Sequence, residues 1–126
     1  MRKFILLLSI FIYTLPMFAQ VSTVWEKRYN GTGNSYDEAT SLFVDASGNI
    51  YVAGASTGSG AGKDFTVVKY NSDGLTQWVG RYNRPGNADD DAYLVKVDNA
   101  GNVYISGTST GSGTGLDYCV VKYNSA

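Results

Sequence analysis

An internal duplication is the feature of this sequence that most constrains its fold. When Trp25 is placed over Trp78, a shift of 53 residues, 27 of the 49 aligned positions are identical and no gap is needed. Repeats of about this length are typical of solenoids, propellers and other arrays in which one small unit stacks on the next. The sequence therefore predicts two copies of one supersecondary unit.

Each copy contains the same series of predicted strands. β-branched and aromatic residues concentrate in short runs that are bounded by Gly, Asn, Asp or Ser, which is the pattern of strands joined by turns. Outside the N-terminal segment no run has a sustained helical period. The fold class that we predict is all-β, with two four-stranded antiparallel sheets built from consecutive strands. The predicted strands are 22–30, 39–45, 49–56 and 64–71 in the first copy, and 75–83, 92–98, 102–109 and 117–124 thereafter.

Two kinds of connection separate these strands. "DASGN", "DNAGN" and "NSDG" are short enough for hairpins, and Gly48, Gly101 and Gly74 can take the positive φ that such turns need. Asp45 and Asp98 are expected to accept hydrogen bonds from nearby backbone amides. The longer connections share the opposite end of the sheets, and function tends to reside on loops of this kind.

The strands 64–71 and 117–124 are apolar on both faces, so each sheet needs a cover on both sides. Sheets stacked around a central axis provide that cover, which favours two blades of a β-propeller. A β-sandwich is the alternative. Propellers have typically four to eight blades, so we expect either further blades or an oligomeric ring. The predicted domains are a signal peptide (1–19), a first repeat with a leading strand (20–77) and a second repeat (78–126).

Three motifs recur in the same order in both copies: D-x-x-G-N-[IV]-Y-[VI]-x-G, D-[FY]-x-V-V-K-Y-N and W-x-x-R-Y-N. This series resembles the bacterial β-propeller repeat called SBBP, over essentially the whole chain after residue 19. The resemblance implies a secreted or surface module with a structural or interaction role. It implies no common catalytic residues, and we expect neither an enzymatic activity nor a cofactor.

The N-terminal segment has the pattern of a secretory signal. Arg2 and Lys3 precede an almost wholly apolar stretch, and Ala19 offers a small residue for cleavage before Gln20. A membrane anchor is the alternative, but the apolar stretch is shorter than the roughly 20 residues that a span needs and contains Pro16. We expect a secreted, periplasmic or cell-surface protein with no membrane contact after the signal is removed.

Composition excludes several classes of function. Without residues 1–19, eight Lys and Arg stand against eleven Asp and Glu, and no basic patch indicates a nucleic-acid partner. The sequence has no histidine, which excludes Ser-His-Asp and Cys-His nucleophiles and histidine metal sites. Cys119 is the single cysteine, so it forms no internal disulfide, and its counterpart in the first copy is Thr66. This equivalence favours a packing role for Cys119.

The glycine-rich stretch "STGSGAGKD" at 56–64 invites comparison with a phosphate-binding loop. The pattern G-x-x-x-x-G-K-[ST] needs glycine where this chain has Thr57, and Ser or Thr where it has Asp64. Leu116 replaces Lys63 in the second copy. We therefore interpret the stretch as a flexible connection between two strands and predict no nucleotide binding.

The long loops between the copies' first two predicted strands carry the candidate ligand residues. Their carboxylates offer oxygen atoms of the kind that calcium prefers, but the EF-hand spacing is absent, and support of the following strand is the structural alternative. Tyrosine-rich strands can stack on sugars, and paired carboxylates serve glycosidases. A carbohydrate- or cation-binding propeller is thus a second hypothesis, and a fragment of a propeller hydrolase is a third. The partner that we expect is an unknown protein or glycan. The candidates are Asn34, Asp37, Asn87, Asp90 and Asp91.

Overall fold

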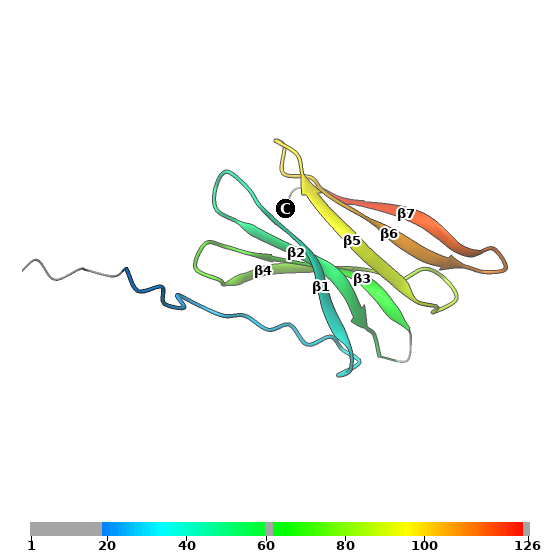
Figure 1. Ribbon diagram of the computed structural model, residues 1–126. Helices are drawn as coiled ribbons and strands as arrows, with labels where there is room; N and C mark the ends of the chain where they lie inside the picture. The colour runs from blue at the N-terminus through cyan, green and yellow to red at the C-terminus, as the bar shows by residue number, and fades with distance from the viewer. Residues whose placement is uncertain (1–18, 60–61, 125–126) are drawn as a thin grey trace, which may run out of the picture.

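Two antiparallel sheets make up the protein, as a computed structural model of the chain shows (Figure 1). The structure describes residues 19–59 and 62–124, and every regular element in them is a β-strand. Each strand pairs with the one that follows it in its sheet, so the predicted all-β fold of consecutive antiparallel strands is confirmed. Residues 1–18 of the predicted signal peptide (1–19) lie outside the residues that the structure describes. The strands are β1 (Asp37–Val44), β2 (Ile50–Thr57), β3 (Lys63–Tyr70) and β4 (Thr76–Tyr82) in the first sheet, and β5 (Asp90–Val97), β6 (Val103–Gly111) and β7 (Gly115–Tyr123) in the second.

The tight turns form as the sequence predicts. Gly48, Gly101 and Gly74 have φ values of 80°, 82° and 75°, in the region that side chains other than glycine rarely adopt. Asp45 Oδ1 accepts hydrogen bonds from the backbone amides of residues 47 and 49, both at 2.9 Å. Asp98 accepts the equivalent pair at 2.9 and 2.8 Å. The first hairpin of each copy is therefore closed by the same arrangement, an aspartate that accepts two backbone amides and a glycine with positive φ.

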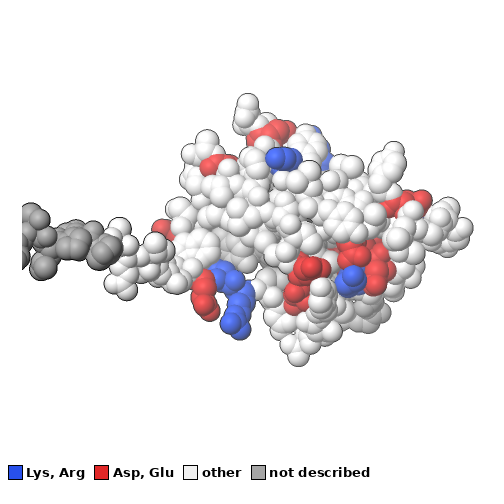
Figure 2. Space-filling model, viewed as in Figure 1, with Lys and Arg blue, Asp and Glu red and all other residues white. Residues whose placement is uncertain are grey.

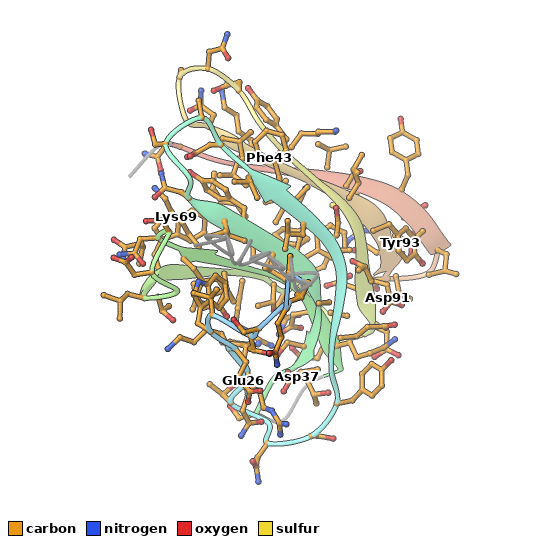
Figure 3. All side chains as sticks on the ribbon, turned by 60° about the vertical axis from the view of Figure 1, so that its left-hand side comes forward. Glu26, Asp37, Phe43, Lys69, Asp91 and Tyr93 are labelled. Atoms are coloured by element: carbon orange, nitrogen blue, oxygen red, sulfur yellow. The ribbon has the colours of Figure 1, made fainter. Side chains whose placement is uncertain are left out.

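The predicted strand at 22–30 is wrong, and the second sheet has three strands instead of four. Within the described residues, no strand precedes β1. The reason lies in the pairing of its sequence equivalent, β4, which hydrogen-bonds to β3 of the preceding unit. Within the described residues no strand like β3 precedes 22–30, so the backbone of this segment has no described strand edge to pair with there. The segment instead runs across the first sheet on the side away from the second sheet (Figure 3).

The glycine-rich connections are shorter than predicted. β2 extends to Thr57 and β3 begins at Lys63, and these two residues are register partners. In the second sheet the pairing continues to Gly111 and Gly115. The ladder therefore extends into both glycine-rich stretches, because small residues there permit continued pairing up to a short turn.

The core lies between the two sheets. Phe65 and Val67 of β3 are fully buried against Val95, Val103 and Ile105 of the second sheet. Hydrogen bonds also cross the interface: Thr40 Oγ1 donates to the Ala92 carbonyl at 2.7 Å, and the Val95 amide donates to Ser41 Oγ at 3.2 Å. The sheets are thus joined by a continuous apolar core and by polar contacts between β1 of the first sheet and β5 of the second.

Candidate functional site

The long loops meet at one end of the molecule. The Gly62 amide donates to the Asn87 carbonyl at 3.2 Å, and the Lys63 amide donates to Asp89 Oδ1 at 2.9 Å. Acidic side chains gather over this end in Figure 2, with basic side chains beside them. Loops from both sheets therefore form a single surface, as the strand order predicts.

Lys63 of the "STGSGAGKD" stretch is held by a carboxylate. Its Nζ lies 2.7 Å from Asp91 Oδ1, and both side chains are about three-quarters buried. The hydrogen bond that Lys63 donates to Asp91 raises the pKa of Lys63 above its ordinary value, against the opposing effect of burial. The ion pair thus links β3 of the first sheet to β5 of the second. It would have to break for Lys63 to bind a phosphate.

Asp91 pairs with Lys63 across the two sheets, and the other four candidate residues support the turns that lead into β1 and β5. Asn34 and Asn87 have positive φ values of 48° and 51°, which asparagine tolerates better than most residues. The Oδ1 atoms of these residues accept hydrogen bonds from the side chains of Asn30 and Asn83, at 2.7 and 2.9 Å. Both asparagines therefore have their side chains engaged within their own turns.

The carboxylates Asp37 and Asp90 occupy the first position of their strands. Asp37 Oδ2 accepts the Gly31 amide at 3.0 Å, and Asp90 Oδ2 accepts the Arg84 amide at 3.2 Å. Within the described residues, Oδ1 of each is buried and has no hydrogen-bond partner. Asp90 is fully buried, so its Oδ1 is a buried polar atom without a hydrogen-bond partner among the described residues, which is uncommon in folded proteins.

A buried polar cluster on the first sheet was not among the sequence predictions. Arg81 of β4 reaches across the sheet, where Nη1 donates to Ser56 Oγ at 2.8 Å and Nη2 donates to Asp64 Oδ2 at 2.6 Å. The Asp64 side chain is 4% exposed, so its charge is balanced almost entirely by this arginine. Burial disfavours the charged guanidinium, but the contacts with Asp64 outweigh it and the pKa of Arg81 is raised. The recurrence of Arg, Ser and Asp at equivalent positions in both copies was the signal.

The second sheet has the same cluster without its arginine. Ser109 and Asp117 are the repeat equivalents of Ser56 and Asp64, and the equivalent of Arg81 is Arg28. Ser109 Oγ is buried and has no partner among the described residues. Arg28 lies far from it in the N-terminal segment, and its side chain is 92% exposed.

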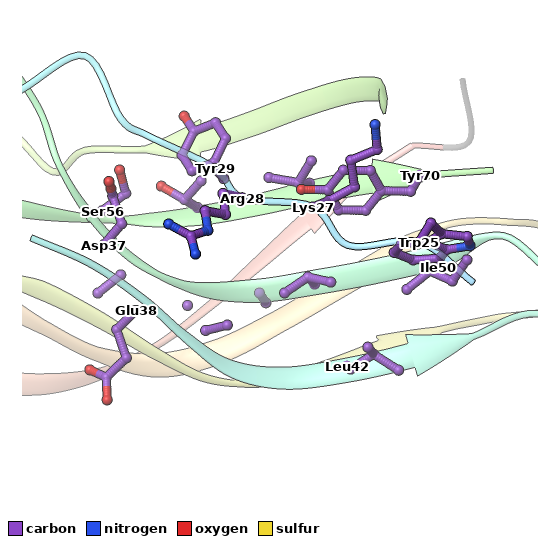
Figure 4. A pocket seen from close by; sticks show the side chains of 17 residues that line it. Trp25, Lys27, Arg28, Tyr29, Asp37, Glu38, Leu42, Ile50, Ser56 and Tyr70 are labelled. Atoms are coloured by element: carbon purple, nitrogen blue, oxygen red, sulfur yellow. The ribbon is translucent and has the colours of Figure 1, made fainter. Parts of the chain in front are cut away.

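A cavity of about 470 Å³ lies between the N-terminal segment and the outer face of the first sheet (Figure 4). Trp25 and Tyr29 stand on one wall, and Leu42, Ile50 and Tyr70 of the sheet on the other. Trp25 Nε1 donates to the Ser72 carbonyl at 3.2 Å, which fixes one end of the segment on the β3–β4 turn. The cavity is mostly apolar at the Trp25 end, and Ser56 and Asp37 lie toward the Tyr29 end.

Two further kinds of site concern the described residues, a metal-ligand cluster and a membrane-spanning helix. In residues 19–59 and 62–124, no group of three or more Cys, Asp or Glu side chains is placed to hold a metal ion. The same residues include no apolar helix long enough to cross a bilayer. Cys119 is a free, half-buried thiol that packs against the core.

Comparison with known proteins adds no family to this geometry. No protein-family model matches the chain, and no curated protein matches it significantly. The candidate site is therefore interpreted from its own residues.

Proposed function

We propose that the chain is a secreted or cell-surface β-propeller repeat module with a structural or interaction role. One observation carries the proposal: both outer faces of the two-sheet stack present large apolar side chains and repeat the residues of a buried face. On the second sheet Tyr118 is 89% exposed, whereas its equivalent in the first sheet, Phe65, is fully buried. Faces of this kind are suited to packing against a further sheet, which is how the blades of a propeller become buried.

A β-sandwich accounts less well for these faces. In a sandwich of two sheets the inner faces form the core and the outer faces alternate with polar residues. Here Leu42 and Val44 are more than half exposed on the first sheet, as are Leu116 and Val120 on the second. Exposed apolar patches at both ends favour further packing over a closed pair of sheets.

The interaction role belongs to the end where the long loops meet. The Lys63–Asp91 ion pair and backbone hydrogen bonds link the described parts of these loops across both sheets, so that they form one surface with several acidic side chains. Loops positioned by a stable scaffold are the usual place for binding residues. The SBBP resemblance and the signal-like N-terminus are the support for export.

Three measurements test the proposal. Electron microscopy of the assembled protein should show discs of radially arranged sheets around a central channel, and an assembly without a central channel would contradict the propeller. N-terminal sequencing of exported protein should begin at Gln20, and a chain that retains Met1 would contradict the signal. A glycan array distinguishes a protein-interaction role, for which no glycan should bind, from the carbohydrate-binding alternative.

A further inference from the structure

The two ends of the stack carry the two halves of one interface. The outer face of the second sheet presents Tyr118 and Val120, which are the repeat equivalents of the buried core residues Phe65 and Val67. The outer face of the first sheet presents Ile50 and Val52 in the cavity, and the equivalents of these two residues, Val103 and Ile105, are fully buried between the sheets. One end of the molecule therefore matches the other end of an identical molecule.

The N-terminal segment and the free edge of β7 are complementary in the same way. β7 pairs with β6 on one side, and no described strand pairs with its other edge. The equivalent edge of β3 is paired with β4, whose sequence repeats that of residues 23–29. When the β3–β4 register is shifted by one repeat, Arg28 lies opposite Cys119 and Tyr29 lies opposite Tyr118. The repeat therefore predicts both the pairing and its register.

Charge complementarity supports this pairing. In that register Arg28 would reach the unpartnered Ser109 Oγ and the carboxylate of Asp117, as Arg81 reaches Ser56 and Asp64. Arg84 already lies 3.2 Å from Oδ2 of Asp117, so Arg28 is expected to bind the other oxygen. A bidentate arginine brought to a buried hydroxyl and a carboxylate is a strong and specific contact.

We propose that a second copy of this chain binds here, so that residues 23–29 of one copy add a fourth strand to β7 of the next. Residues 23–29 lie on the far side of the first sheet from β7, so a chain does not supply its own strand (Figures 1 and 3). The contact is head-to-tail, and such contacts form rings when the rotation between copies closes. Three or four copies give six or eight blades, within the usual range for propellers. This inference rests on the proposed function.

The natural cysteine makes the register testable with one substitution. Residues that face each other in an antiparallel pair have Cα atoms about 4.5 to 5.5 Å apart, within the range that a disulfide spans. Arg28→Cys should therefore form an intermolecular disulfide with Cys119 under mild oxidation of the full chain, expressed with its N-terminal segment. The ladder on a non-reducing gel should end at three or four chains. Lys27→Cys is the matched control, because position 27 falls opposite Val120 and its side chain points to the other face.

Light scattering tests the energetics without a new cysteine. Arg28→Ala should raise the concentration at which the oligomer forms by at least about tenfold, as expected for the loss of a charge-assisted pair. Lys27→Ala removes the neighbouring charge and should leave that concentration within about threefold of its original value, because no counter-charge faces it. A protein that stays monomeric, a ladder with no upper limit, or equal cross-linking of the two cysteine variants would overturn the inference.

Hydrogen exchange separates the inference from the function on which it rests. The amides of Val95 and Ile105 lie in the core between the sheets. If they are strongly protected in a monomer, the stacked sheets exist and only the copy-to-copy pairing is wrong. If they exchange rapidly, the stack itself is absent and the proposed module fails as well.

Discussion

Two valines at the same position of the repeat should differ sharply in their contribution to stability. Val67 of β3 is fully buried between the sheets, whereas its equivalent Val120 of β7 is 61% exposed on the outer face of the second sheet. Replacing either residue with alanine removes the same two methyl groups. The comparison therefore isolates the effect of burial from that of side-chain chemistry and strand position.

The expected magnitudes follow from that burial. Removal of two buried carbons from Val67 costs about 1.6 kcal/mol in transfer free energy at ~0.8 kcal/mol per group. The unfilled space adds a cavity term, so Val67→Ala should lower the free energy of unfolding by about 2 to 3 kcal/mol. Val120→Ala loses less than half of the transfer contribution and leaves no cavity, so its cost should be about 0.5 kcal/mol in the dissociated chain.

Urea unfolding followed by far-ultraviolet circular dichroism measures both values. At protein concentrations below that of assembly the two variants should differ by about 2 kcal/mol. As the concentration rises, Val120 becomes buried in the proposed ring, and Val120→Ala should then lose the stabilisation that assembly gives the unsubstituted protein. Equal losses for both variants at the lowest concentration would mean that a single chain already covers the outer face of the second sheet, which would refute the reasoning.

Three further predictions concern the polar cluster, the bulges and the turns. Arg81→Met should destabilise the fold by about 3 to 5 kcal/mol because it leaves Asp64 buried without a partner, and the added change Asp64→Asn should recover part of that loss in a double-mutant cycle. Gly107→Ala should lower the melting temperature strongly, because the new Cβ would overlap the Asp91 carbonyl oxygen at the β5 bulge and backbone atoms cannot move aside cheaply. Burial would raise the pKa of Asp45, but hydrogen bonds from Asn49 and the turn amides lower it overall, so its contribution is present above about pH 4 and is lost as the pH falls through the lowered value. The free energies of unfolding of the unsubstituted protein and Asp45→Asn should therefore converge in acid and differ at neutral pH by less than about 1 kcal/mol, because the carboxylate is only partly buried.

The strands and tight turns could be predicted because their determinants are local. Seven predicted strands form, and Gly48 and Asp45 act in the first hairpin as the sequence indicates. The run at 22–30 has the composition of β4 but forms no strand, because a strand also requires an edge to pair with. The β-propensity of a segment depends on its own residues, so it does not predict whether a neighbouring strand is available to pair with it.

The candidate site was less predictable for a related reason. Arg81 lies 25 residues from Ser56 and 17 from Asp64, and only the register of three strands brings their side chains together. Because side chains alternate between the two faces of a sheet, the sequences of β3 and β7 show which residues share a face. They do not show which face another sheet covers. Phe65 and Tyr118 have the same pattern around them and opposite burial, because one sheet has a neighbour on that side and the other does not.

The offset between the sequence repeat and the sheet explains why both open ends arise together. The duplicated unit begins at Trp25, but the first sheet begins at Asp37, so the leading segment of each unit has the sequence of a strand that belongs to the sheet before it. β4 shows this directly, since it opens the second unit and completes the first sheet. In any whole number of such units, the leading segment of the first unit therefore has no preceding sheet to join. The last strand of the last unit likewise has one edge with no strand beside it. Because Arg28 lies on this leading segment and Ser109 and Asp117 lie beside this free edge, the polar groups at the two ends are complementary: Ser109 Oγ has no partner among the described residues, and Asp117 binds Arg84 through Oδ2.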